Sequence, residues 1–357
     1  MNSQPAYNTH THVVDILGNV KGRDQPIMLM SKAIELVTTL DAEVFLDDDV
    51  VFFDPFCKAG EILLACAFSS CRAKFELVPE LFTEEAFKKQ VEKELYHSSR
   101  YFALAPDERH HRLSLRTFLG NENSHKEHFN HIIRNGNYVS EIDGKLNRDK
   151  FEQEFSSMLE HIKSTSGNKK IIAVGNPPYQ ESDGGAQKSA KPIYQIFVNS
   201  LINHCQINEF VLVIPARWFA GGKGLDSFRE STINSKNVKS LKYFAKSGEV
   251  FPTVDIDGGI CFFHWDEINN SKPEFIVDEK RQKIDLSEYD IIPDDPGAYE
   301  ILHKIRSKWN GKWVSDVAWS RKPFGLSTDY FKKNNSIDPS KFEDAVMCIG
   351  RQDQQIM

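Results

Sequence analysis

The apolar positions of this chain follow two different periods. Within residues 27–40, Leu29, Ala33 and Leu36 recur every three to four positions, which predicts a helix with one face in a core. Shorter runs of consecutive apolar residues are typical of strands buried on both faces of a parallel sheet. Such runs occupy 50–53, 101–105, 171–175, 210–214, 241–244 and 260–263, the last following two glycines as in a hairpin.

Helical periods separate several of these runs, at 61–71 and 193–201. Strands that alternate with helices predict an α/β sheet with helices on both faces. The charged stretch 73–99 keeps a helical period and is expected to be an insertion. After Asp266 the pattern changes to short mixed segments, so we expect a domain boundary near that residue.

Composition narrows the class of protein. The chain has 357 residues, of which 40% are hydrophobic and 27% charged, enough for one large or two modest cores. Its six cysteines form no Cys-x-x-Cys pair, so neither a zinc module nor a disulfide framework is indicated. No leader pattern and no run of roughly 18 apolar residues is present. We therefore expect a cytoplasmic protein without a membrane partner.

The net charge of −7 argues against a protein that coats nucleic acid through bulk electrostatics. The C-terminal stretch 301–357 is nevertheless basic, with ten basic residues against six acidic ones. Its tryptophans are expected to form the core of a small domain; they are Trp309, Trp313 and Trp319.

Two loops at predicted strand ends carry candidate chemistry, because ligands of open α/β sheets bind beyond the carboxyl ends of the strands. The first begins at Asp54 and ends at Gly60, whose missing side chain lets a ligand approach the start of a helix. Taken alone, this loop fits an ordinary structural turn equally well.

The second loop is Asn176-Pro177-Pro178-Tyr179, directly after the run 171–175. Its prolines stiffen the turn, so the Asn176 side chain and the Pro177 carbonyl can both accept hydrogen bonds from one amino group. Tyr179 offers a flat face on which a base can stack. The alternative is a rigid turn with a core tyrosine.

Together the loops resemble those of S-adenosylmethionine-dependent DNA methyltransferases. Asp-Pro-Phe-Cys-x-x-Gly resembles the cofactor loop of that family, and Asn-Pro-Pro-Tyr resembles the catalytic loop of its members that methylate the adenine amino group. The helix preceded by 21–24 resembles the N-terminal cofactor segment of the family. It comes before both loops, as in the gamma arrangement of restriction-modification methylases. Further similarities lie at 210–215, 251–259 and 322–325.

The resemblance implies a Rossmann-like class I methyltransferase sheet with helices on both faces and a smaller mixed C-terminal region. It divides the chain into an N-terminal extension (1–20), a cofactor-binding and catalytic domain (21–266) and a partial DNA-recognition region (267–357). Asn176 and Pro177 would bind the target amino group, Pro178 would stiffen their loop, and Tyr179 would stack on a flipped adenine. No metal is needed. The residues implied to bind the cofactor are Asp54, Pro55, Phe56, Cys57, Gly60, Asp107 and Asn137.

Three positions depart from the family pattern. Lys58 stands where the family usually has a glycine, and would narrow the cofactor pocket or place a cation near the sulfonium. Either effect would weaken cofactor binding. The acid that grips the cofactor ribose should close the second strand, but Ala105 stands there, and Asp107 follows two residues later. Asn137 occupies the position where an acid often contacts the cofactor adenine.

The histidines suggest no further site. His125, His128 and His131 are three residues apart and could share a helix face, but a metal centre requires further ligands. His110 and His111 are expected to be solvated.

The leading hypothesis is a site-specific adenine methyltransferase acting on double-stranded DNA, in a restriction-modification or phage-defence system. Because the chain ends soon after its basic segment, we expect a truncated recognition domain or a specificity or restriction subunit that completes it. Two alternatives stay open. One is a protein-glutamine methyltransferase, because a carboxamide also offers two hydrogens. The other is a non-catalytic DNA-binding or assembly subunit that has kept the fold.

Overall fold

The computed structural model describes residues 27–311, apart from 82, 98, 120–131, 141, 143, 181–190, 253 and 290, and two short strands at 347–349 and 354–356. The predicted features at 1–24 and 322–325, and the three histidines of 125–131, lie outside this part. The chain divides into two compact units, Met1–Ile301 and Leu302–Met357. In the second unit β10 (Met347–Ile349) pairs with β11 (Gln354–Ile356) in antiparallel fashion.

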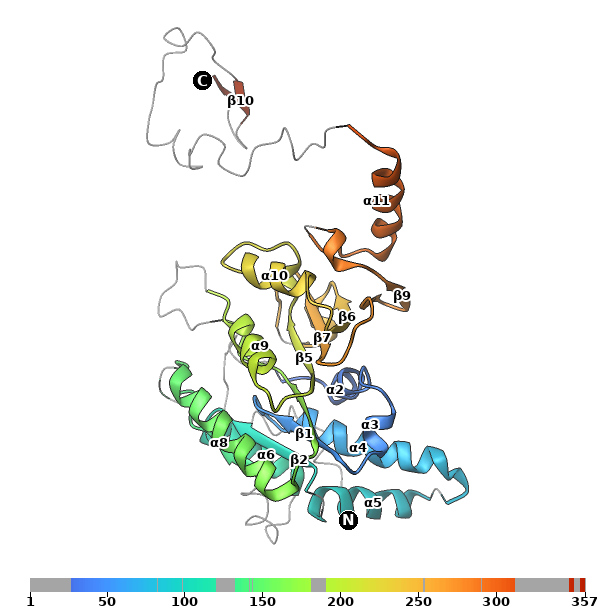
Figure 1. Ribbon diagram of the computed structural model, residues 1–357. Coiled ribbons are helices and arrows are strands. Elements are labelled where there is room, and N and C mark those ends of the chain that lie inside the picture. Colours follow the sequence, from blue (N-terminus) through green and yellow to red (C-terminus); the bar gives the residue numbers. More distant parts are fainter. Residues whose placement is uncertain are drawn as a thin grey trace. The chain divides into compact units, whose positions relative to one another are not determined.

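The first unit is built around a nine-stranded sheet (Figure 1), in the order β3-β2-β1-β4-β5-β7-β6-β8-β9. Neighbouring strands from β3 to β5 are parallel, whereas β7 runs antiparallel to both β5 and β6. The order 3-2-1-4-5-7-6 with a reversed seventh strand is that of class I methyltransferases, so the expected fold class is confirmed. The strands are β1 (Val50–Asp54), β2 (Tyr101–Ala105), β3 (Ile133–Asn135), β4 (Lys170–Gly175), β5 (Glu209–Pro215), β6 (Val238–Phe244), β7 (Ile260–Asp266), β8 (Glu274–Val277) and β9 (Lys280–Lys283).

Helices cover both faces of the sheet. Successive residues of a strand point to opposite sides, and the apolar side chains on both sides pack against helices. Phe52 stacks on Phe45 on one side, and Phe53 stacks on Phe155 on the other. The first face carries α2 (Met30–Val37), α3 (Glu43–Leu46), α4 (Glu61–Leu77) and α6 (Glu108–Leu119), and the second carries α8 (Arg148–Ser166), α9 (Tyr194–Asn203) and α10 (Asp226–Ile233) (Figure 1). Short 3-10 turns occur at η2 (Pro79–Leu81), η3 (Ala216–Phe219), η4 (Ser247–Glu249) and η5 (Leu286–Glu288).

Two boundaries differ from those expected. Helix α4 does not stop before 73 but continues to Leu77, and α5 (Glu84–His97) packs against it because Phe68 and Phe75 both contact Phe87. The change of pattern at Asp266 does not end the sheet, since β8 and β9 extend it. Helix α11 (Pro296–Lys308) begins within the same unit, where Tyr299 contacts Phe275 of β8.

At the amino end of β5 a buried charge is fully partnered. Glu209 accepts hydrogen bonds from His264 (Nε2 to Oε1, 2.6 Å) and from Lys170 (Nζ to Oε2, 2.6 Å). Burial by itself would raise the pKa of Glu209, but these hydrogen bonds outweigh it and lower the pKa to about 2. The cluster therefore joins β4, β5 and β7 through a carboxylate that stays ionised.

We expect Glu209→Gln to destabilise the protein in a pH-dependent way. A depressed pKa gives stability above the ordinary pKa of the carboxyl, and this stability is lost as the pH falls through the folded value. The contribution is roughly 3 kcal/mol at pH 7, and about half of it is lost by pH 3. Denaturant unfolding of both proteins at pH 7, 5 and 3 measures it. Exposed Glu230→Gln is the control, and a difference that does not change with pH would contradict the prediction.

The carboxyl ends of β1 and β4 approach closely at Gly175. A Cβ atom placed on Gly175 would lie 2.9 Å from Oδ1 of Asp54 and 3.1 Å from Cδ2 of Phe56. Only glycine therefore fits here without displacing the residues that begin the loop after β1.

We expect Gly175→Ala to lower the free energy of unfolding by about 1 to 3 kcal/mol, because the added methyl group overpacks a buried contact. The matched control is Gly248→Ala, where the added methyl would meet nothing within 4 Å. Chemical denaturation of the two variants tests the contrast, and equal stability of both would show that the strand ends can separate at no cost.

Candidate active site

The loop after β1 is compact and buried. Oδ1 of Asp54 accepts a hydrogen bond from the amide of Phe56 (3.0 Å). Burial raises the pKa of Asp54 well above its ordinary value, and this hydrogen bond only partly offsets it. Gly60 has a left-handed φ of 81° and stands directly before Glu61, the first residue of α4. The predicted turn is therefore present, with a buried carboxyl at one end and a helix start at the other.

Two further contacts attach this loop to neighbouring strands. The amide of Cys57 donates to the carbonyl of Leu104 in β2 (3.1 Å). The hydroxyl of Tyr138, which follows β3, donates to the carbonyl of Pro55 (3.1 Å). Burial also raises the pKa of the Cys57 thiol, which favours the protonated and unreactive form.

A cation and a second carboxyl are buried beside Asp54. Burial lowers the pKa of Lys58 to about 8, against the opposing influence of Glu61 and Asp54. Glu61 accepts a hydrogen bond from the amide of Met28 (3.1 Å), so the segment before α2 contacts the start of α4. Burial raises the pKa of Glu61. Glu61 is not among the site residues expected from the sequence, although its position directly after Gly60 could have indicated it.

The loop after β4 lies beside the first loop. Asn176 is 2% exposed, and Pro177 is also buried. Tyr179 is partly buried; its hydroxyl donates to the carbonyl of Val213 in β5 (3.3 Å), which holds the ring in place. Nζ of Lys58 lies 5.9 Å from the centre of that ring. The structure thus brings together the predicted cofactor loop and the predicted catalytic loop.

The loop after β2 uses its acid within the fold. Asp107 accepts from the amide of His110 through Oδ1 (2.9 Å) and contacts Nδ1 of the same ring through Oδ2 (2.7 Å). Burial opposes but does not cancel the effect of these contacts, so the pKa of Asp107 is lowered. Nε2 of His110 is buried and has no hydrogen-bond partner among the described residues.

The expectation that His110 and His111 are solvated is wrong. Both lie near the start of α6. There the ring of His110 is hydrogen-bonded to Asp107, and Nε2 of His111 contacts the carbonyl of Ile133 in β3 (2.9 Å). Asn137, by contrast, is exposed and has a left-handed φ of 45°. Its amide donates to Oδ1 of Asn135 (2.9 Å), so its backbone N–H is not available to a ligand.

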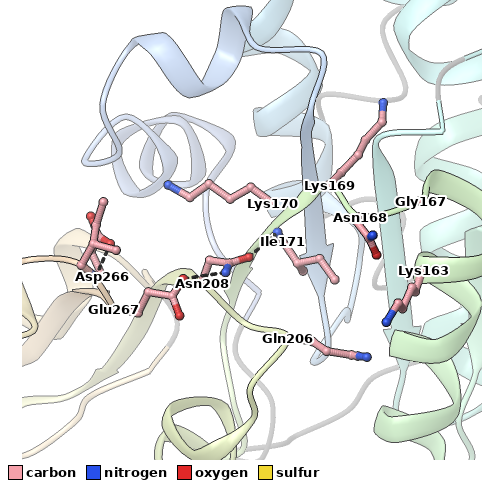
Figure 2. Close-up of a pocket in the computed structure, with 11 residues that line it drawn as sticks. Lys163, Gly167, Asn168, Lys169, Lys170, Ile171, Gln206, Asn208, Asp266 and Glu267 are labelled. Carbon is pink, nitrogen blue, oxygen red and sulfur yellow. Dashed lines mark hydrogen bonds between the residues drawn. The ribbon is translucent and has the colours of Figure 1, made fainter.

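Hollows on the surface occur away from these loops. One of about 450 Å³ lies at the amino ends of β4 and β5 (Figure 2), the opposite edge of the sheet. Its polar groups bind each other: Asn208 accepts from the amide of Ile171 (3.0 Å) and donates to Glu267 (2.6 Å). Another, of about 580 Å³, is lined by residues of α2, β6, β8 and β9. Neither touches Asp54 or Asn176.

In the part of the chain that the structure describes, no three His, Cys, Asp or Glu side chains are grouped so as to hold a metal ion. The helices of this part are also too short or too polar for any of them to span a membrane.

Comparison with known proteins finds similar sequences and similar structures, which are described as methylases or restriction-modification enzymes. A curated protein of Mycoplasma pneumoniae, described as an uncharacterized adenine-specific methylase, is 30% identical over 178 residues. The match covers 46% of this chain and 40% of that protein, so the chain spans well under two thirds of its relative.

Solved structures are similar at lower identity. A modification subunit of a putative type I restriction enzyme from Vibrio vulnificus is 13% identical, with 89% of this chain and 61% of that chain covered and a TM-score of 0.41. The Type ISP enzyme LlaGI, in complex with a DNA substrate mimic, is 10% identical, with 81% and 27% covered and a TM-score of 0.47. The fold assignment rests on the strand order and not on these two likenesses.

The model of the Eco57I restriction-modification methylase family matches residues 69–251, just over half of this chain. That range includes the predicted catalytic loop and strands β2 to β6, and it begins within α4, after the predicted cofactor loop has ended at Gly60. The chain belongs to the Eco57I restriction-modification methylase family.

Proposed function

We propose that this protein is a site-specific DNA adenine methyltransferase. It would transfer a methyl group from S-adenosylmethionine to the amino group of an adenine rotated out of the duplex, in a restriction-modification or phage-defence system. The observation that carries the proposal is the contact between the two loops, seen in the closeness of Gly175 to Asp54 and of Lys58 to Tyr179. Family membership and the adenine-specific methylase of M. pneumoniae support it.

The loop after β1 has groups that fit the cofactor. The methionine part of S-adenosylmethionine carries an amino group, for which Asp54 and Glu61 supply buried carboxyls. Gly60 carries no side chain that would block a ligand at the start of α4, and Pro55, Phe56 and Cys57 would form the wall between. The bound cofactor would supply an electrophilic methyl group.

The adenosine part would lie against the loops after β2 and β3. Ala105 provides no acid for the ribose, so we assign that role to Asp107 acting through His110. Nε2 of His110 is buried without a partner in the described part of the chain, and an imidazole nitrogen can bond a ribose hydroxyl. Asn137 would reach the adenine with its side chain.

The loop after β4 would activate the target. An adenine amino nitrogen is a weak nucleophile because its lone pair is delocalised into the ring. Hydrogen bonds to Asn176 and to the Pro177 carbonyl would favour a more tetrahedral nitrogen, aligned with the methyl group. Pro178 stiffens the loop, and Tyr179 would stack on the base, which offsets part of the cost of removing it from the duplex. Transfer would break the bond between the methyl carbon and the sulfonium sulfur, leaving S-adenosylhomocysteine, and one amino hydrogen would be lost as a proton to water.

We also propose double-stranded DNA as the partner, with a catalytic domain that begins near residue 21 and continues past Asp266 through β9. The basic stretch within 267–357 would form part of the recognition region. A specificity or restriction subunit would complete it.

Asn176→Ala is expected to lower methyl transfer to double-stranded DNA by about 100-fold or more, because it removes one of two acceptors aligned with the reacting amino group. Cofactor affinity should change little. The measurement is transfer of radiolabelled methyl groups by the intact chain, combined with methylome sequencing of DNA from expressing cells. Exposed Asn234→Ala is the control and should keep full activity.

The same assay separates the alternatives. Methyl transfer to glutamine-containing protein but not to DNA would replace the proposal with a protein-glutamine methyltransferase. A folded protein that binds no labelled cofactor would indicate a non-catalytic subunit.

His110→Ala should weaken binding of S-adenosylmethionine by roughly tenfold, the worth of one buried hydrogen bond. His111→Ala is the matched control, because its ring already bonds the carbonyl of Ile133. Isothermal titration calorimetry gives both affinities. Equal affinity of the two variants would remove His110 from the cofactor site.

A further inference from the structure

Lys58 is the least satisfied charge in the loop after β1. Its side chain is only 4% exposed, and it makes no hydrogen bond or ion pair with any residue that the structure describes. Removing an ammonium from water costs several kcal/mol unless partners replace the lost hydration. This energetic cost arises at a position where the family usually has an uncharged glycine.

The groups around Lys58 do not satisfy it. The ring of Tyr179, at 5.9 Å, provides a cation–π contact but no hydrogen-bond acceptor for the three ammonium donors. Asp54 and Glu61 attract the charge from a distance, but one oxygen of each already bonds a backbone amide, from Phe56 and Met28. No described residue therefore accepts a hydrogen bond from the ammonium, so its donors are available to water or to a ligand.

Position and charge restrict that group. Lys58 lies in the loop assigned to the methionine part of the cofactor and contacts the loop assigned to the target base. A DNA phosphate would have to enter this buried space, whereas the cofactor already carries a small anion of suitable size. Its amino acid end bears one positive and one negative group, and the loop offers the complement of each.

We propose that the Lys58 ammonium binds the carboxylate of the methionine part of S-adenosylmethionine, while Asp54 and Glu61 face its amino group. This inference rests on the proposed function, which supplies the cofactor. It also reverses the expectation that Lys58 weakens cofactor binding. A glycine at this position would let the backbone approach the cofactor closely. The lysine would instead place a charged side chain at the methionine end of the cofactor, away from the adenine.

The test compares two ligands that differ only in this carboxylate, S-adenosylmethionine and its decarboxylated form. Wild-type protein should bind S-adenosylmethionine roughly 10- to 100-fold more tightly, the range expected for a charge-assisted hydrogen bond. Lys58→Met should bind both ligands equally, with the affinity that wild type shows for the decarboxylated form. Calorimetry measures all four affinities without any need for methyl transfer.

Two controls accompany the variant. Lys236→Met removes an exposed lysine just before β6 and should keep the full preference for the carboxylate. Circular dichroism and denaturant unfolding report whether Lys58→Met folds. Because the wild-type comparison needs no variant, the inference stays testable even if Lys58→Met does not fold.

The outcomes are distinct. If wild type binds S-adenosylmethionine without preferring it over the decarboxylated form, or if Lys58→Met keeps the preference, the Lys58 assignment is overturned and the proposed function stands. If folded wild-type protein binds neither ligand, the proposed function fails and this inference fails with it.

Discussion

Parallel pairing of β1 with β4 is the constraint on which the candidate site depends. Asp54 and Asn176 are about 120 residues apart in sequence, yet their strands are hydrogen-bonded neighbours in register, with Phe53 opposite Ala173. Both loops therefore begin at the same edge of the sheet. A slip of one residue would turn Phe53 away from Phe155 and toward the other helical layer. The packing that fills the core thus also aligns the two loops.

Buried charges are partnered differently at the amino ends and at the carboxyl ends of the strands. At the amino edge, Glu209 accepts hydrogen bonds from His264 and Lys170, and this arrangement contributes to stability. At the carboxyl edge, Asp54, Glu61 and Lys58 are buried close together. Burial raises the pKa of the two carboxyls and lowers the pKa of the lysine, which favours the neutral form of each. Proteins accept such local costs mainly at functional sites, where a ligand completes the arrangement.

The same contrast applies to the loop after β2. The family resemblance implies an acid at the end of β2 that grips the cofactor, whereas here Asp107 is held by His110 of the helix that follows it. The polar atom left over belongs to His110 instead. A change of one residue at the end of a strand, Ala105 in place of an acid, is thus accompanied by a different buried polar group a turn away.

The sequence by itself determined the elements and the loops. Apolar runs such as 171–175 and turns such as Asn176-Pro177 are local patterns, and the periods of strands and helices follow from backbone geometry alone. Only the tertiary structure decided the burial of Lys58 and His110, the contact of Tyr138 with Pro55 and the continuation of the sheet beyond Asp266. These features depend on side chains that meet across long sequence separations, and the shielding of a charge from water is a property of everything packed around it.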